Sequence, residues 1–146
     1  MSEINYSKLN YYGTKVAISK SQEAIKKFLV KFGLQGTRFT EYKNVGVIEF
    51  ILFKNGKEMA FRFKYDFPEN KNHKRQVYRA LFHYLKNRFV AIEFGITTIE
   101  DEFFQELVLK LPNGATSTVK EIVKNQLNQL EYSSELQLPF KKKEGD

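Results

Sequence analysis

NHKRQVYRALFHYLKNRFVAIEFG, residues 72–95, is the stretch that decides the fold of this chain. Its apolar residues recur with i, i+3, i+4, i+7 spacing, which places them on one stripe of a helix. The residues of this stripe are Val77, Leu81, Tyr84, Leu85, Phe89 and Ile92. The stretch therefore predicts a long central helix, roughly 30 Å from end to end, that packs one face on a core.

Away from that stripe, cationic residues alternate with aromatic rings. One row consists of Arg75, Arg79 and His83, and the row beside it consists of Lys74, Tyr78, Phe82 and Lys86. Two interpretations are open. The rows are either a solvated helix face with two aromatic residues at its edge, or a surface on which cations meet phosphates while rings stack on bases.

The chain has 146 residues, no cysteine and a net charge of +7. Its length fits one domain that can bury a core without metal or disulfide support. Residues 1–95 hold 18 Lys and Arg against 8 Asp and Glu, or +10, whereas residues 96–146 hold 6 against 9, or −3. A polyanion would therefore be attracted to the first part of the chain and repelled by the second.

Asn55-Gly56 lies between two alternating apolar runs and is the strongest hairpin signal in the chain, because a type I′ turn needs positive φ at both central positions. A two-residue turn sets the register of the two strands, 46–54 and 57–65. Leu52 then faces Met59, Phe50 faces Phe61 and Ile48 faces Phe63, and these six residues make an apolar face under the helices.

The same register predicts a second sheet face that is half apolar and half charged. It contains Val47, Glu49, Ile51, Phe53, Glu58, Ala60, Arg62 and Lys64. One interpretation is a groove in which bases pack on Ile51 and Phe53 while phosphates meet Arg62 and Lys64. The other is that the N-terminal segment or a second subunit covers this face.

The remaining segments predict further elements around the hairpin and the long helix. A helix is expected from Ser19 or Ser21 to Phe32, a strand at 37–43, and helices at 99–109 and 119–130. Residues 1–131 are expected to form one α+β domain. Residues 132–146 lack periodicity and are expected to be a poorly ordered tail.

No motif for catalysis is apparent. The two histidines are not at metal-ligand spacing, and the chain has no P-loop, dinucleotide-binding glycines or nucleophile elbow. Glu41-Tyr42-Lys43 has the Glu-x-Lys form of some nucleases but lacks a preceding aspartate. We expect neither an enzyme nor a metal or cofactor site. The absence of a long apolar run or a signal-peptide core also predicts an intracellular protein without a membrane span.

Several short motifs resemble a family of small hypothetical proteins from phages, prophages and mobile elements, over roughly residues 19–118. The motifs are Tyr78-Arg79, Leu85-Lys86, Ala91-Ile92-Glu93, Gly95, Glu102-Phe103-Phe104 and Asn113-Gly114. The chain departs from the family at Tyr78, where tryptophan is preferred, and at Gln105-Glu106-Leu107, where Leu-Pro-Tyr is usual. The order of elements is also similar to that of the thermophile single-stranded DNA-binding proteins called ThermoDBP.

The sequence thus predicts an α+β fold: a small antiparallel sheet of three or four strands packed against a long central helix and two to three further helices. The predicted function is sequence-nonspecific binding of single-stranded DNA, and of RNA as a further candidate, in replication, recombination or protection of mobile-element DNA. The predicted site consists of Ile51, Phe53, Arg62, Lys64, Arg75, Tyr78, Arg79, Phe82 and Lys86. The alternative is a phage-encoded inhibitor or adaptor that binds protein through the half-apolar sheet face. A homo-oligomer, a dimer, is also expected, because the predicted surface exposes more apolar area than is usual for a domain of this size.

Overall fold

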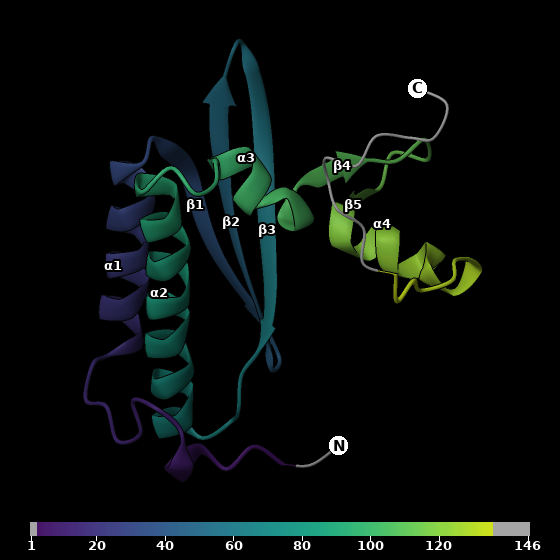
Figure 1. The fold of residues 1–146 in the computed structure, drawn as a ribbon. Coiled ribbons are helices and arrows are strands. Elements are labelled where there is room, and N and C mark those ends of the chain that lie inside the picture. Colours follow the sequence, from purple (N-terminus) through teal and green to yellow (C-terminus); the bar gives the residue numbers. More distant parts are fainter. Residues whose placement is uncertain (1–2, 136–146) are drawn as a thin grey trace, which may run out of the picture.

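The computed structural model describes residues 3–135 of the chain, drawn in Figure 1. Before the loop that follows the long helix, the elements are η1 (Tyr6–Lys8), α1 (Ile18–Lys31), β1 (Leu34–Tyr42), β2 (Val45–Lys54), β3 (Lys57–Asp66) and α2 (Lys71–Glu93). After it come α3 (Ile99–Glu102), η2 (Phe104–Glu106), β4 (Val108–Lys110), β5 (Thr116–Thr118), α4 (Val119–Gln126) and η3 (Leu127–Gln129). The predicted poorly ordered tail lies outside the described residues from position 136 onward.

The main sheet is a three-stranded antiparallel meander in the order β1-β2-β3. Its β2–β3 register is the predicted one, with Phe50 opposite Phe61 and Glu49 opposite Arg62. Asn55 and Gly56 have φ of 54° and 76°, as a type I′ turn requires. The Asn55-Gly56 turn therefore determines which side chains of this hairpin share a face.

Helices α1 and α2 lie side by side over one face of this sheet (Figure 1). The core between the two layers contains Phe50, Phe61, Leu85 and Phe89, with Phe63 and Leu81 packed against it. The α+β fold and this shared core are confirmed. Both helices pack on this one face of the sheet, so neither α1 nor α2 covers the opposite face.

The buried stripe of α2 is rotated relative to the predicted one. Tyr84, predicted to face the core, is half exposed, whereas Tyr78 is fully buried. Tyr78 can be buried because its hydroxyl has two partners: it donates to Glu41 Oε1 at 2.6 Å and accepts from the Tyr65 hydroxyl at 2.8 Å. Burial of a tyrosine is favourable when the hydroxyl is satisfied in this way.

The predicted helix at 99–109 is wrong beyond its first turn. Thr98 caps α3 through the amide of Asp101, but the chain then turns and Leu107 pairs with Phe61 at the outer edge of β3. The cause is Phe103, which is fully buried against Phe50, Phe63 and other core rings. A continuous helix would have carried the following residues away from that contact.

The last described elements form a small unit beyond β3, in which β4 and β5 pair and α4 follows (Figure 1). The helix predicted at 119–130 is present as α4 and η3, and the Thr118 side chain caps it. Arg88 of α2 anchors the chain that leads to this unit, since it forms ion pairs with Glu102 at 2.9 Å and Glu106 at 2.7 Å. None of the helices within residues 3–135 has the length and apolar character to cross a membrane.

Candidate nucleic-acid interface

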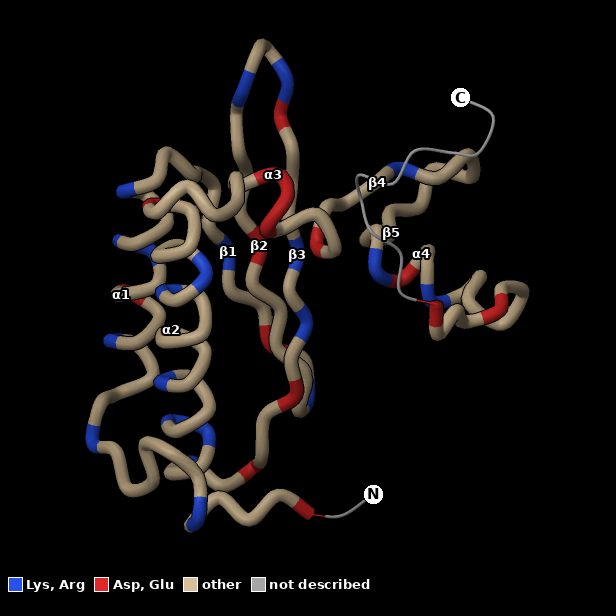
Figure 2. The backbone as a smooth tube through the Cα atoms, in the orientation of Figure 1, with Lys and Arg blue, Asp and Glu red and all other residues tan. Residues whose placement is uncertain are grey.

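Positive charge is concentrated on the two long helices. Together α1 and α2 carry ten Lys and Arg residues but only two Glu residues, Glu23 and Glu93. Figure 2 shows these cations repeated along both helices, while most of the acidic positions lie on the sheet and in the chain after α2. The layer that covers the core is therefore also the most basic part of the molecule.

Aromatic rings lie between the cations where α1 meets α2. Phe28 of α1 and Phe82 of α2 are both half-buried, and their rings meet edge to face with centroids 6.5 Å apart. Arg79 lies over the Phe82 ring at 4.5 Å from its centroid, and Lys86 lies over the same ring at 6.0 Å. Lys31 lies over the Phe28 ring at 5.8 Å. These distances are in the range of cation–π contacts.

His83 extends this cluster along α2. Its ring meets Phe82 edge to face at 5.0 Å and stacks on Tyr11 of the N-terminal segment at 4.7 Å. Desolvation, together with the positive charges of Arg79 and Lys86, holds the pKa of His83 below its ordinary value. We call the set Phe28, Lys31, Arg79, Phe82, His83 and Lys86 the cationic helix face.

The three cations of the cationic helix face have no ion-pair partner among the carboxylates of residues 3–135. Their positive charges are thus not neutralised by a described carboxylate, although the Nε of Arg79 is buried. The rings beneath them are partly exposed. Cations above an aromatic surface are the arrangement by which single-stranded nucleic acids are bound without sequence readout.

The opposite face of the sheet is different, although the sequence predicts cations there too. Arg38, Glu49 and Arg62 occupy neighbouring positions on β1, β2 and β3. Glu49 accepts from Arg38 Nε through one carboxylate oxygen and from Arg62 Nε through the other, each at 3.0 Å. Burial acts to raise the pKa of Glu49, but the hydrogen bonds and charges of the two arginines more than offset it and leave that pKa lowered.

We call this surface, made of Arg38, Val47, Glu49, Ile51, Phe53, Ala60, Arg62 and Lys64, the open sheet face. Lys64 is also paired, with Glu121 of α4 at 3.5 Å. The predicted phosphate contacts of Arg62 and Lys64 would therefore have to displace carboxylates. Val47, Ile51 and Ala60 are half-buried, and Phe53 beside the turn is 60% exposed.

Eight of the nine residues of the predicted site thus lie on two opposite sides of the molecule with the core between them, and the ninth, Tyr78, is buried. Arg79, Phe82 and Lys86 belong to the cationic helix face, and Arg75 lies one turn before Arg79 with its guanidinium on Asn72. Ile51, Phe53, Arg62 and Lys64 belong to the open sheet face. The two groups therefore do not form one continuous surface in the described residues.

Tyr78 is a correction to the predicted site. It is 0% exposed and points toward the sheet, so its ring cannot stack on a base. Burial and the hydrogen bond to Glu41 raise the pKa of Tyr78, which keeps the hydroxyl protonated. The residue holds α2 on β1 and β3 instead of facing a ligand.

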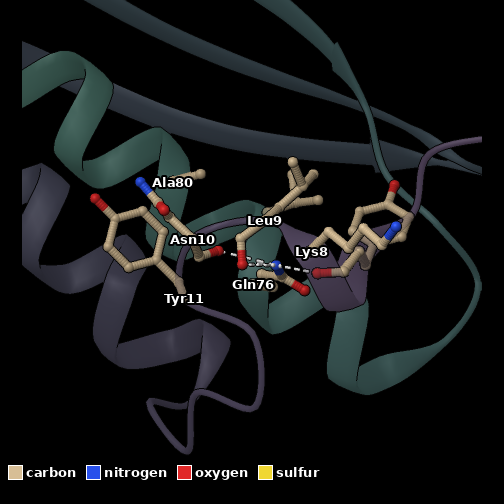
Figure 3. Close-up of a pocket in the computed structure, with 8 residues that line it drawn as sticks. Lys8, Leu9, Asn10, Tyr11, Gln76 and Ala80 are labelled. Atoms are coloured by element: carbon tan, nitrogen blue, oxygen red, sulfur yellow. Dashed lines mark hydrogen bonds between the residues drawn. The ribbon is translucent and has the colours of Figure 1, made fainter.

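The N-terminal segment, residues 5–14, packs against α2 and does not cover the open sheet face, which was one of the two interpretations of that face. We call it the N-terminal arm. Gln76 of α2 fastens it, since its Nε2 donates to the carbonyls of Tyr6 and Asn10 at 2.9 Å each. Tyr6 stacks on His73 at 4.6 Å as Tyr11 does on His83. Between the arm and α2 lies a cavity of about 390 Å³ (Figure 3).

Phe28 and Lys31 belong to the cationic helix face but were not among the predicted site residues. Their spacing of three residues was the available signal, because it places a ring and a cation on adjacent parts of one helix surface. For Gln76 and the arm there was no signal, since their contact joins residues about 70 positions apart.

Compared with models of known protein families, with curated proteins and with solved structures, the chain gives no match. The similarity to phage-encoded proteins and to ThermoDBP therefore stays an expectation from short motifs and element order. Within residues 3–135, no group of three His, Cys, Asp or Glu side chains is placed to hold a metal ion.

Proposed function

We propose that this protein binds single-stranded nucleic acid through the cationic helix face, without sequence specificity in that contact. DNA is the primary candidate ligand. The proposal is carried by the contact between the rings of Phe28 and Phe82. Lys31 lies over the first ring, and Arg79 and Lys86 lie over the second. None of these three cations is paired with a carboxylate of the described residues. The unpaired cations can bind the phosphate of a nucleotide, and the partly exposed rings can stack on its base.

In this mechanism the phosphates of the strand displace water and counterions around Lys31, Arg79 and Lys86. Each phosphate contact releases bound cations from the strand, so affinity falls as salt rises. Bases splayed from the backbone stack on the exposed parts of Phe28, Phe82 and His83. Single strands are favoured over duplex because duplex bases are already stacked on each other and cannot reach these rings.

The test is a titration of a fluorescently labelled oligonucleotide at low and at high salt, with duplex as competitor. We expect single strand to bind more tightly than duplex and more weakly at high salt. Lys31→Ala should weaken binding, whereas Lys57→Ala, an exposed lysine beside the Asn55-Gly56 turn, serves as the matched control. Equal affinity for duplex and single strand would contradict the proposal, as would the absence of binding at low salt.

The wider role follows from the resemblance to mobile-element proteins. A protein that coats single strands without specificity would act in replication, recombination or protection of such DNA. This part of the proposal is supported by the similar motifs and element order alone.

A second candidate is a protein-binding module that uses the open sheet face. The observation in its favour is that Val47, Ile51, Ala60 and the exposed Phe53 share a surface on which Glu49 is paired with both Arg38 and Arg62. Burial of the apolar side chains favours association, and the partner has to offset the desolvation of the paired charges. A second copy of the chain is one partner that it fits, and light scattering at tens of micromolar tests for the dimer. A strict monomer would leave only a different protein as the partner.

A further inference from the structure

A second cavity, of about 400 Å³, lies between the first turn of α2 and the loop that leads from the N-terminal arm to α1. Figure 1 shows this loop beside the start of α2. The cavity is lined by residues 12–15 of the loop and by Asn70, Asn72, His73 and Arg75. None of these lining residues is acidic. We call this space the loop cavity.

The two cations of the loop cavity have no carboxylate partner. Lys15 is exposed and Arg75 is partly exposed, and neither forms an ion pair within residues 3–135. Although the Nε of Arg75 is buried, its Nη2 donates to Asn72. Its Nη1 has no hydrogen bond to a described residue and is not one of the buried nitrogens without a partner, so it reaches solvent. The cavity therefore offers positive charge to an anion.

Aromatic rings lie beside these cations. Tyr12 is 57% exposed, and the centroid of its ring lies 6.5 Å from that of His73. His73 also stacks on Tyr6 at 4.6 Å, which holds the imidazole in place. The loop cavity thus repeats the combination found on the cationic helix face, namely unpaired cations beside a ring that solvent can reach.

Arg75 connects the two surfaces. It precedes Arg79 by four residues, about 6 Å along the axis of α2, and residues four apart share one side of a helix. A strand whose phosphates meet Lys86 and Arg79 therefore meets Arg75 next, and the loop cavity follows. The opposite direction leads to the exposed Glu93 at the negative end of the helix dipole, where a phosphate is repelled.

We propose that the loop cavity is a second nucleotide subsite, which binds a further nucleotide of the strand held on the cationic helix face. Lys15 and Arg75 meet its phosphate, and its base stacks on the exposed ring of Tyr12. The amides of Asn72 and His73 take no part, because both already donate to Asn70 Oδ1. This inference rests on the proposed function, and it gives the strand a direction, toward the start of α2.

The experiment measures the salt dependence of binding for a single strand of about twelve nucleotides, by fluorescence anisotropy with the full chain. Lys15→Ala and Arg75→Ala should each reduce the slope of log affinity against log salt by about 0.7, which is the loss of one phosphate contact. Lys57→Ala removes an exposed lysine beside the Asn55-Gly56 turn and should keep the wild-type slope.

Tyr12 provides a measurement that does not depend on charge. Tyr12→Ala should weaken binding at least about five-fold at constant slope, because it removes a stacking surface and no cation. Tyr12→Phe keeps the ring and should keep the affinity. Tyr42→Ala is the matched control, since Tyr42 is 72% exposed on β1 and lines neither surface.

The outcomes separate this inference from the proposed function. A wild-type slope in Lys15→Ala or in Arg75→Ala would overturn the inference, and so would wild-type affinity in Tyr12→Ala. If Arg79→Ala still reduces the slope in that case, the proposed function stands without the second subsite. Absence of binding by the wild-type protein at low salt would overturn both.

Discussion

The cationic helix face and the open sheet face contain the same kinds of residue, cations beside apolar side chains, but they differ in how the cations are partnered. Arg62 and Lys64 of the open sheet face are each paired with a glutamate. Arg79 and Lys86 of the cationic helix face lie over an aromatic ring and have no such partner among the described residues. The comparison teaches that a count of basic residues does not locate an anion site, because partners contributed by other elements decide which charges remain available.

The largest effect is expected from a pair of substitutions that separates the two sides of the sheet. Phe50 and Phe53 lie on the same strand, but Phe50 is fully buried under the helices and Phe53 is 60% exposed. Phe50→Ala should lower the free energy of unfolding by about 3 to 5 kcal/mol, because it removes a core ring and leaves a cavity. Denaturant unfolding measures the change.

Phe53→Ala is the control for that substitution, and its cost should stay below about 1 kcal/mol because the ring is largely in water already. Phe61→Ala and Leu85→Ala, on the β3 and α2 sides of the same core, should fall in the range of about 2 to 5 kcal/mol. Similar costs for Phe50 and Phe53 would show that the open sheet face is covered in solution, as a dimer would cover it.

Tyr78→Phe gives the next largest effect and tests the correction to the predicted site. The substitution removes the hydroxyl that joins Glu41 to Tyr65 and leaves both without that partner. The expected cost is about 1 to 3 kcal/mol in unfolding free energy, with the affinity for oligonucleotides unchanged in the folded protein. A loss of affinity without a loss of stability would return Tyr78 to the binding surface.

The fold could be predicted largely from local signals, and the site only in part. Asn55-Gly56 determines a register that later elements do not alter, so the six inward residues of the hairpin were predicted correctly. The phase of α2 could not be predicted as well, because Tyr78 becomes a core residue only when Glu41 and Tyr65 reach its hydroxyl from other strands. The pairing of Arg62 with Glu49 does follow from the register, and it was the available warning that this arginine is not free.

The pH dependence of unfolding tests the ion pairs of Glu49 on the open sheet face. Because its pKa in the folded protein is below the ordinary value of 4.5, the carboxylate stabilises the fold at any pH above that value. This stability is lost as the pH falls through the lowered pKa of the folded state. Wild-type protein should therefore lose more unfolding free energy than Glu49→Gln between about pH 5 and about pH 3. Parallel curves for the two proteins would mean that Arg38 and Arg62 do not hold Glu49 in solution.

The smallest expected effect, on the salt dependence of binding, tests the comparison most directly. Each phosphate that meets a cation contributes about 0.7 to the slope of log affinity against log salt for a single strand. Arg79→Ala and Lys86→Ala should each reduce that slope by about 0.7, whereas Arg62→Ala and Lys64→Ala should leave it unchanged. His83→Ala removes a stacking surface and not a counterion contact, so it should weaken binding by about 1 to 3 kcal/mol at constant slope.

Glu49→Gln completes the series, because it releases Arg38 and Arg62 from their shared carboxylate without adding a cation. If the strand runs only over the cationic helix face, this variant has the wild-type slope. A steeper slope for Glu49→Gln would mean that the released arginines meet phosphates, and the open sheet face would then be part of the path of the strand.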